Sequence, residues 1–210
     1  MNKRDCKGLM LVLSSPSGAG KTTLCKKIVE IDKQIILSIS ATTRPKRKSE
    51  IEGKDYFFTT DEDFKLTRKK GLFLESAKVF DYLYGTPKKF VEDKLKQGID
   101  IIFDIDWQGA QKLSDFSKSD LVSIFILPPS TKTLKSRLKK RAEDSDLIVK
   151  NRMAKAKSEI SHWIEYDYVL VNEDIEKCTT KIIEILNAER LKRFRQKYLF
   201  KFVEELLNTN

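Results

Sequence analysis

The sequence is poor in the residues that most often carry covalent or metal chemistry. Its 210 residues include only three cysteines and one histidine. Cys6, Cys25 and Cys178 are odd in number, scattered and in no metal-ligand spacing, so a reducing, cytoplasmic compartment is the simplest inference. His162 stands beside Trp163 in an apolar helical segment, which is more typical of a structural residue than of a general base.

Long apolar runs are also missing. No stretch approaches the roughly 20 apolar residues that span a bilayer. Lys3 and Arg4 precede the apolar run 9–13, but that run passes directly into a polar loop without a cleavage-like segment. We therefore expect no export signal and no membrane partner. We also find no internal repeat and no low-complexity linker, so one sizeable core with a small inserted subdomain is expected.

The charge balance is strongly positive, with a formal net charge of +10 and a pI near 9.4. Such a balance suits polyanionic ligands but does not distinguish nucleotides from nucleic acids. Binding of nucleic acid predicts a basic stripe with interleaved aromatic residues, and only the C-terminal segment comes close to one. We therefore expect no nucleic-acid partner.

A phosphate-binding loop is the most informative feature that is present. Residues 14–23, S-S-P-S-G-A-G-K-T-T, follow the apolar run 9–13 and lead into a helical pattern. In a strand–loop–helix unit, glycines let backbone N–H groups converge on phosphate oxygens. The lysine supplies a mobile cation, and the next hydroxyl can bind Mg²⁺. The alternative is a Ser/Gly loop that only caps a helix, because the usual motif has Gly at the position of Ser15.

This loop predicts the binding of a nucleoside triphosphate. Lys21 would reach the β- and γ-phosphates and Thr22 the metal. The residues predicted to bind ATP here are Ser15, Pro16, Ser17, Gly18, Ala19, Gly20, Lys21, Thr22 and Thr23.

The spacing of apolar runs predicts an α/β fold with a parallel sheet. The runs lie at 9–13, 35–39, 99–103, 121–127 and 168–171. Segments of helical length separate most of them, which is the rhythm of β-α-β units. The third run ends at Asp104, where the carboxyl edge of a parallel sheet would present this carboxylate to a nucleotide and Mg²⁺. Asp106, just beyond, is as well explained as the cap of a following helix.

Three further segments complete the predicted organisation. The stretch 43–97 is too long for a loop, contains strand-like pieces at 56–59 and 72–75, and predicts a subdomain. A polar interval at 141–146, before an amphipathic segment at 147–164, predicts a mobile lid. Beyond residue 174 the chain has helical periodicity almost to its end. We expect the aromatic C-terminal helix to pack on the core, with its exposed remainder available for a homo-oligomer contact.

Guanidinium groups and hydroxyls gather in the segment 40–56. Arg44 and Arg47 offer planar donor forks for bidentate phosphate recognition, and Tyr56 can donate to the same anion. A solvated run of charges is the alternative interpretation of these residues taken alone.

These motifs, in this order, resemble those of guanylate kinases. The similar elements are T-T-R-x-x-R at 42–47, G-x-D-Y at 53–56, Glu75, and Y-G-T at 84–86. The resemblance continues through D-I-D-W-Q-G at 104–109, P-P-S at 128–130 and the Y-D-Y segment at 166–168, and so covers essentially the whole chain. In such kinases a small residue other than glycine often stands where Ser15 is found here.

The resemblance implies a role for each matching residue. The GMP phosphate would be held by Ser40, Arg44, Arg47, Tyr56 and Tyr84, the guanine would be recognised by Glu75 and Thr86, and Asp104 would border GMP and the Mg²⁺ site. The catalytic residues would be Lys21, Arg44, Arg137, Arg141 and Arg152, and Asn172 would join the ATP site. An ionised carboxylate can accept both N1–H and the N2 amino group of guanine, a pair that adenine lacks.

The implied protein is a single P-loop domain that phosphorylates GMP, and dGMP as well, with Mg²⁺ and ATP. Its core would comprise 1–39, 91–137 and 157–210, its GMP-binding subdomain 40–90 and its lid 138–156. Two alternatives stay open at this point. One is a non-catalytic module that binds a phosphorylated protein in the GMP cleft. The other is a kinase for a different phosphorylated metabolite.

Overall fold

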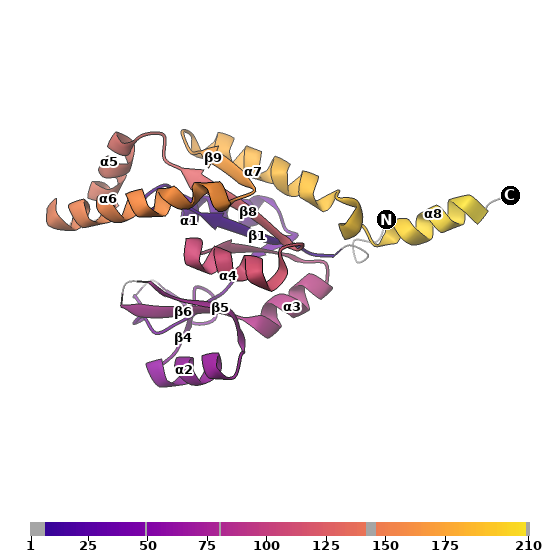
Figure 1. Cartoon of the computed structure of the whole chain (residues 1–210), viewed down its shortest axis with the longest axis horizontal. Coiled ribbons are helices and arrows are strands. Elements are labelled where there is room, and N and C mark those ends of the chain that lie inside the picture. The colour runs from indigo at the N-terminus through magenta and orange to yellow at the C-terminus, as the bar shows by residue number, and fades with distance from the viewer. Residues whose placement is uncertain (1–6, 49, 80, 142–145, 209–210) are drawn as a thin grey trace.

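A parallel five-stranded sheet forms the centre of the computed structural model. The structure describes residues 7–48, 50–79, 81–141 and 146–208, and nothing is said of the side chains of residues 140–150. The strand order is β2-β7-β1-β8-β9 (Figure 1). The strands are β1 (Met10–Ser14), β2 (Ile35–Leu37), β7 (Asp100–Asp104), β8 (Leu121–Leu127) and β9 (Tyr168–Val171). The predicted α/β class with a parallel sheet core is confirmed.

Helices cover both faces of this sheet, and for that reason β1 is apolar at nearly every position. Leu11 and Leu13 face the helices α1 (Lys21–Ile31) and α7 (Ile175–Arg190). Met10 and Val12 point to the opposite face, where α3 (Lys88–Lys96) and α4 (Trp107–Ser117) pack. All four of these side chains are fully buried. Each such burial contributes about 1.5–3 kcal/mol, so β1 is a rigid base for the loop that follows it.

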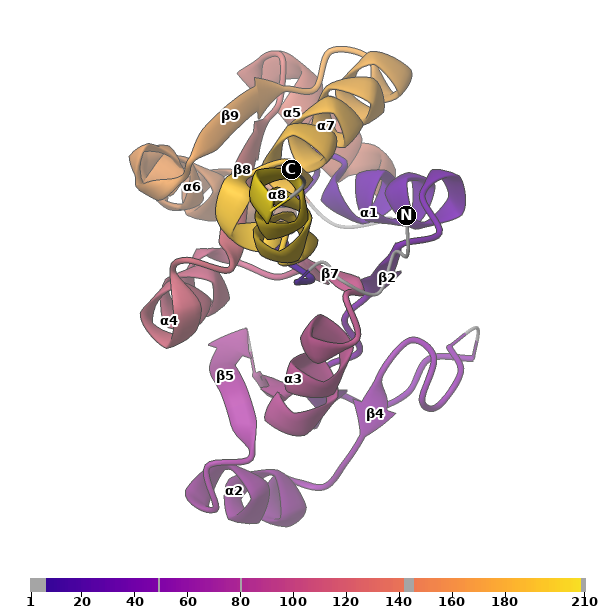
Figure 2. The same cartoon turned by 90° about the vertical axis from the view of Figure 1, so that its right-hand side faces the viewer.

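The inserted stretch forms a second, four-stranded sheet with the order β4-β3-β6-β5 (Figure 2). Its strands are β3 (Ala41–Thr42), β4 (Phe57–Phe58), β5 (Phe73–Val79) and β6 (Tyr82–Pro87). The helix α2 (Asp61–Lys69) begins after Thr60, whose hydroxyl accepts a hydrogen bond from the Asp63 backbone and caps it. At Gly85 a side chain would approach the rings of Phe64 and Phe73 to 3.0 Å, so glycine lets these rings cover β6.

Two helices form the arm above the loop after β1. They are α5 (Thr131–Arg141) and α6 (Asp146–Ile160), which pack through Leu134, Leu138 and Ala156. The predicted amphipathic segment 147–164 is helical throughout, but its last turn tightens into the 3₁₀ helix η2 (Ser161–Glu165). Part of the predicted lid, residues 142–145, lies outside the described residues.

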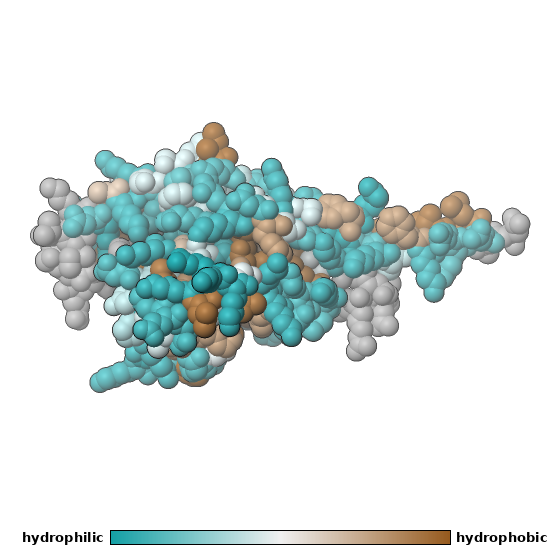
Figure 3. All heavy atoms as spheres, turned by 60° about the horizontal axis from the view of Figure 1, so that its bottom comes forward, coloured by the Kyte–Doolittle hydropathy of each residue, from teal (hydrophilic) through white to brown (hydrophobic). Residues whose placement is uncertain are grey.

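The C-terminal segment differs from the expectation. It breaks at the 3₁₀ helix η3 (Arg193–Arg195) and continues as α8 (Tyr198–Asn208). The prediction that the aromatic end packs on the core is wrong for α8, which has no buried residue. Figure 1 shows it projecting from the body, and Figure 3 shows hydrophobic residues along its length. The change of direction arises at Arg195, which is buried and whose carbonyl accepts a hydrogen bond from the Lys7 backbone at 3.0 Å.

Candidate active site

The loop after β1 contains two positions whose backbone conformation favours glycine. Gly18 and Gly20 have φ angles of 90° and 101°, in the left-handed region. A Cβ atom on Gly20 would also lie 2.6 Å from Nδ2 of Asn172. Gly20 is the N-cap of α1, so the positive end of that helix and its free N–H groups lie at the loop. The predicted phosphate-binding geometry therefore has the helix terminus that it needs.

The loop borders a cavity of about 410 Å³. Residues from five other parts of the chain complete its walls, and this brings together side chains that the sequence separates widely. The cavity is lined by Ser15, Pro16, Ser17, Gly18, Gly20, Lys21, Thr22, Thr23, Tyr56, Val79, Asp104, Asp106, Arg137, Arg152, Lys155 and Glu159. A volume of this size accommodates the phosphate chain and part of a nucleoside.

Asp104, at the end of β7, is the charged centre of the cavity. Its Oδ1 lies 2.9 Å from Nζ of Lys21, and its Oδ2 accepts a hydrogen bond of 2.7 Å from Oγ1 of Thr22. The Lys21 ammonium also donates to the carbonyl of Ile105 at 2.7 Å. Burial is the largest influence and lowers the pKa of Lys21, but the attraction and hydrogen bond of Asp104, together with Cys25 and Asp106, leave the net pKa raised. Lys21 is therefore a fixed cation at the mouth of the loop.

Thr22 and Asp104 also suit a magnesium ion. Both offer hard oxygen donors at the carboxyl edge of the sheet. Across the described residues, no cluster of three or more His, Cys, Asp or Glu side chains could hold a metal alone. Mg²⁺ is commonly bound by one or two protein oxygens together with substrate phosphates. These two residues fit that mode of binding.

The predicted phosphate clamp of the inserted sheet is organised around Arg44. Its Nη2 lies 2.5 Å from Oε1 of Glu50, and its guanidinium lies 5.3 Å from the ring centre of Tyr56 and 5.9 Å from that of Phe58. Tyr56 meets Tyr84 edge-on with the ring centres 6.0 Å apart. The structure therefore brings Arg44, Tyr56 and Tyr84 together.

Ser40 and Arg47 are the two other residues predicted to hold the GMP phosphate. Arg47 is exposed on the loop, and its backbone N–H donates to Glu50 Oε2 at 2.8 Å. Ser40 directly precedes β3, and its carbonyl accepts from the backbone of Phe57. Their contact with a phosphate stays a prediction.

Glu75 and Thr86 form a buried pair across β5 and β6. Thr86 Oγ1 donates to Glu75 Oε1 at 2.7 Å, and the two residues are register partners. Their exposures are 4% and 0%. Burial raises the pKa of Glu75 to about 7. The predicted base-recognition residues are therefore adjacent and shielded from water.

Asp106 caps a helix, as the sequence suggested, and its role in the site stays a prediction. Its Oδ1 accepts a hydrogen bond of 3.0 Å from the Gly109 backbone, which caps α4. The same residue lines the cavity beside Asp104. Capping occupies only one carboxylate oxygen, so the side chain can serve both purposes.

The arm contributes two of the three predicted arginines to the cavity. Arg137 lies on α5, and its Nη1 is 3.4 Å from the Ala19 carbonyl of the phosphate loop. Arg152 on α6 lines the cavity from the other helix. The side chain of Arg141 lies outside the described residues.

Asn172 holds the phosphate-binding loop through its side chain. Its Nδ2 donates to the Ala19 carbonyl at 2.8 Å, and the side chain is buried. The residue does not line the cavity. Direct contact between Asn172 and ATP therefore stays a prediction, while its contact with the loop is an observation.

Two acidic residues of the site were not singled out from the sequence. Glu159, on α6, accepts a hydrogen bond of 3.1 Å from the Ser17 backbone in the phosphate loop. Glu50 holds Arg44 as described above. Lys155, one turn before Glu159, also lines the cavity. The spacing 152, 155, 159 along one helical face could have pointed to the α6 residues.

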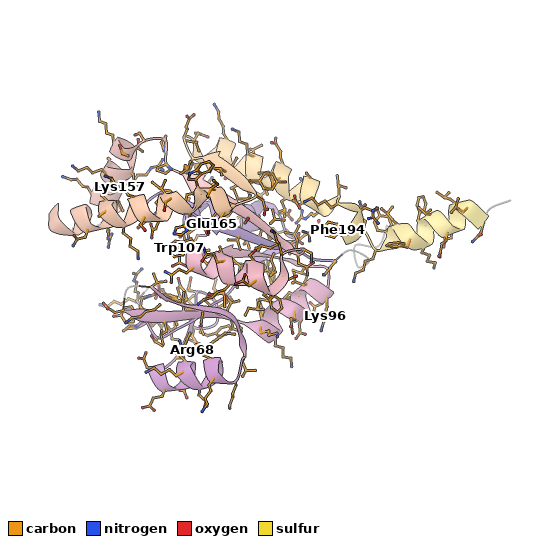
Figure 4. The ribbon with its side chains drawn as sticks, viewed as in Figure 1. Arg68, Lys96, Trp107, Lys157, Glu165 and Phe194 are labelled. Atoms are coloured by element: carbon orange, nitrogen blue, oxygen red, sulfur yellow. The ribbon has the colours of Figure 1, made fainter. Side chains whose placement is uncertain are left out.

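His162 has the structural surroundings that the sequence predicted. Its ring stacks on Trp107 with the ring centres 3.7 Å apart, and its Nδ1 lies 2.6 Å from Glu165 Oε1. Glu165 also accepts a hydrogen bond of 2.8 Å from Gln111 of α4. Figure 4 shows Trp107 and Glu165 close together where α4 meets the end of α6. These contacts fasten the base of the arm to the core.

The comparison with known families decides the assignment. Residues 7–189 match the family model described as guanylate kinase. The chain belongs to the guanylate kinase family. A guanylate kinase of Paramagnetospirillum magneticum is 54% identical over 200 residues, covering 95% of this chain and 94% of the relative. A guanylate kinase of Maricaulis maris is 50% identical over 201 residues, covering 96% and 92%.

A solved structure supports the same guanylate kinase assignment at the level of the fold. The crystal structure of guanylate kinase from Anaplasma phagocytophilum matches with a TM-score of 0.81 and 39% sequence identity. The match covers 100% of both chains. The family resemblance inferred from the motifs is thereby confirmed, and the chain is a nucleoside monophosphate kinase.

Proposed function

We propose that this chain transfers the γ-phosphate of Mg-ATP to GMP, giving ADP and GDP, and that it accepts dGMP as well. Transfer from ATP to GMP follows from the guanylate kinase family. The observation that supports GMP most directly is the buried pair of Glu75 and Thr86. We also propose the metal, the use of dGMP and the individual residue roles.

Glu75 would recognise guanine by accepting its two adjacent donors, N1–H and the N2 amino group. Thr86, which now donates to Glu75, would turn its hydroxyl to the guanine O6. Adenine would leave the buried carboxylate unmatched, and sites built on such hydrogen bonds discriminate by roughly 10⁴-fold or more. None of these contacts uses the ribose 2′-hydroxyl, and for that reason we include dGMP.

The acceptor phosphate would be held by Arg44, Tyr56 and Tyr84, with Ser40 and Arg47 at its margins. Arg44 already has a fixed orientation through Glu50 and two aromatic rings. A guanidinium fork of this kind binds two phosphate oxygens at once. Because a phosphate oxygen anion is the nucleophile, the reaction needs no general base.

The donor would lie along the phosphate loop, with its β- and γ-phosphates at the N-terminus of α1 and at Lys21. Arg137 and Arg152, together with Arg141, would neutralise the equatorial oxygens of the transferring group. Thr22 and Asp104 would hold Mg²⁺, directly or through water, which supplies charge neutralisation between the phosphates when bound. Approach of α6 would exclude water that could otherwise hydrolyse ATP.

We propose a cytoplasmic location and no nucleic-acid or membrane partner. Both described cysteines, Cys25 and Cys178, are unpaired and buried, which suits a reducing compartment. Among the described residues, no helix has the length and apolarity needed to cross a bilayer.

A non-catalytic module that binds phosphoproteins is the competing function. It would use the clamp of Arg44, Tyr56 and Tyr84 but would have no need for the donor side of the cavity. The ion pair of Lys21 with Asp104 and the presence of Arg137 beside the loop favour the kinase.

The first experiment is a coupled assay of ADP formation from Mg-ATP with GMP, dGMP, AMP, CMP and UMP offered separately. We expect turnover with GMP and dGMP only. Turnover with AMP or a pyrimidine nucleotide at a comparable rate would remove the role of Glu75 and Thr86. Absence of turnover with every acceptor, in folded protein with magnesium present, would favour the binding module.

A further inference from the structure

Ser14, the last residue of β1, directly precedes the phosphate-binding loop and has no role in the reaction proposed above. It exposes 1% of its surface and does not line the cavity. Its Oγ donates a hydrogen bond of 3.1 Å to the backbone carbonyl of Ile105. The bond joins the ends of two neighbouring parallel strands, because Leu13 of β1 is the register partner of Asp104 of β7. Any effect of Ser14 on a nucleotide must therefore pass through the group that it holds.

The Ile105 carbonyl receives a second hydrogen bond, from the site itself. Nζ of Lys21 donates to the same oxygen at 2.7 Å. A carbonyl oxygen has two lone pairs and can accept both bonds at once. One donor is the buried hydroxyl of Ser14, and the other is an ammonium group in the cavity wall. The two donors therefore share one acceptor, and only one of them has a reason to leave it.

That reason is the binding of ATP, and this step rests on the proposed function, in which Lys21 reaches the β- and γ-phosphates. An ammonium group has three N–H donors. Two of them now bind Asp104 and the Ile105 carbonyl. Contact with two phosphate groups therefore requires Lys21 to release one of these acceptors. Because a hydrogen bond between opposite charges is the stronger one, the neutral carbonyl is released before the carboxylate of Asp104.

The release is costly if the carbonyl has no other donor. A polar group that loses its partner away from water bears the full penalty of its desolvation. The hydroxyl of Ser14 keeps the Ile105 carbonyl hydrogen-bonded after Lys21 has turned away. We propose that Ser14 is a positioning residue for Lys21, whose hydroxyl holds the Ile105 carbonyl so that the ammonium group is free to turn to the phosphates of ATP.

The alternative is that Ser14 only ties β1 to β7. Its loss would then reduce folding stability and would affect ATP binding equally whether or not Lys21 is present. Ser123 on β8 provides the matched control. It is also a buried serine of the central sheet, its Oγ donates to Oδ2 of Asp167 at 2.7 Å, and it does not line the cavity.

The test is a double-mutant cycle on the full-length chain, read by calorimetric titration with Mg²⁺ and the β,γ-imido analogue of ATP. We expect Ser14→Ala to raise the Kd of the analogue about 10-fold, because the carbonyl is then left without a donor. On a Lys21→Ala background, which has no ammonium group to release, the same change should alter the Kd by less than about 2-fold. Ser123→Ala should leave the Kd within about 2-fold of the wild type, with a loss of Tm similar to that of Ser14→Ala.

Ser14→Cys fills the space of the serine side chain with a weak donor and separates the loss of the hydrogen bond from the creation of a cavity. It should raise the Kd of the analogue about 5-fold, and it supplies the test if Ser14→Ala fails to fold. The KM for GMP should stay within about 2-fold of the wild type in both variants, because Lys21 serves the donor side of the cavity.

An unchanged Kd in Ser14→Cys or in folded Ser14→Ala would overturn the proposal. So would an equal increase in Kd on the wild-type and Lys21→Ala backgrounds, which would assign Ser14 to the shape of the loop alone. A wild type that does not bind the analogue would remove both the proposed ATP site and this role of Ser14. A wild type that binds it without coupling between Ser14 and Lys21 would remove this role and leave the proposed function in place.

Discussion

Thr86 donates a hydrogen bond from Oγ1 to Oε1 of Glu75 across 2.7 Å, and both residues are buried between β5 and β6. Burial raises the pKa of Glu75 to about 7, while the Thr86 hydrogen bond and the charge of Lys112 act in the opposite direction. The carboxyl group is therefore divided between its neutral and ionised forms near neutral pH. A bound guanine, with two N–H donors facing it, would stabilise the ionised form.

The first prediction concerns pH. We expect the KM for GMP to rise as the pH falls through about 7, because a protonated Glu75 cannot accept both guanine donors. The measurement is the KM for GMP and for ATP between about pH 6 and about pH 8.5. The KM for ATP, which does not involve Glu75, is the internal control. A GMP profile parallel to the ATP profile would remove Glu75 from base recognition.

Replacement of Glu75 by glutamine tests separately its role in GMP binding and its effect on folding stability. We expect Glu75→Gln to raise the KM for GMP about 10²-fold, because the new amide N–H₂ faces the guanine donors. Because burial raises the pKa of Glu75 from 4.5 to about 7, the protein loses stability as the pH rises between these two values, and the full cost is present above about 7. Glu75→Gln should therefore raise the free energy of unfolding of the ligand-free protein at about pH 8, by up to about 3 kcal/mol, and leave it nearly unchanged at about pH 5.

The matched control for that variant is Glu184→Gln on the exposed face of α7, which should change neither quantity. A Glu75→Gln variant with wild-type KM for GMP, or one that is less stable at the higher pH, would contradict this account.

Lys21 should be indispensable for turnover but not for folding. Lys21→Ala removes the cation that lies 2.9 Å from Asp104 and that would contact the transferring phosphate. We expect kcat to fall by about 10³-fold or more, with the far-UV spectrum retained and Tm shifted by a few degrees at most. Lys26→Ala makes the same change on the exposed side of α1 and is the control. Near-normal kcat in Lys21→Ala would show that another group bears this role.

Glu50 should act on GMP through Arg44. Its carboxylate holds the guanidinium beside the rings of Tyr56 and Phe58 and also accepts the Arg47 backbone N–H. We expect Glu50→Gln to raise the KM for GMP about 10-fold with little change in the KM for ATP. Glu62→Gln on exposed α2 is the control. Equal effects on both substrates would indicate a general loss of structure instead.

Glu159 should oppose ATP binding in the structure described. It accepts a hydrogen bond from Ser17, whose N–H lies in the loop that would hold phosphate. Burial raises its pKa, and the Ser17 N–H lowers it. We expect Glu159→Gln to lower the KM for ATP about 3-fold, because one negative charge leaves the phosphate site. Glu173→Gln, exposed beyond β9, is the control. An increase in the KM for ATP would show that Glu159 assists the nucleotide.

The sequence predicted those parts of the site that are local in the chain. The strand, loop and helix around Lys21 form one continuous pattern, and the run ending at Asp104 locates the edge of the sheet. Glu159 was missed because its partner Ser17 is 142 residues away; the helical spacing could place Glu159 on the face of Arg152 but could not show which residue it contacts. The periodicity of residues 198–208 predicted a helix correctly. It could not show whether the core or water would cover that helix, because that depends on the turn at Arg195.

The stacking of His162 on Trp107 makes α6 a lever. The C-terminal end of α6 is fastened to α4 by this stack and by the hydrogen bond from Gln111 to Glu165, so this end is the fulcrum. Arg152 lies nine residues along the helix from Ser161, which is about 14 Å away. A rotation of about 10° at the fulcrum therefore moves Arg152 by about 2 Å, roughly the difference between a water-separated and a direct contact with phosphate. A small rotation of the ring pair would thus be converted into a larger displacement of the Arg152 charge at the cavity.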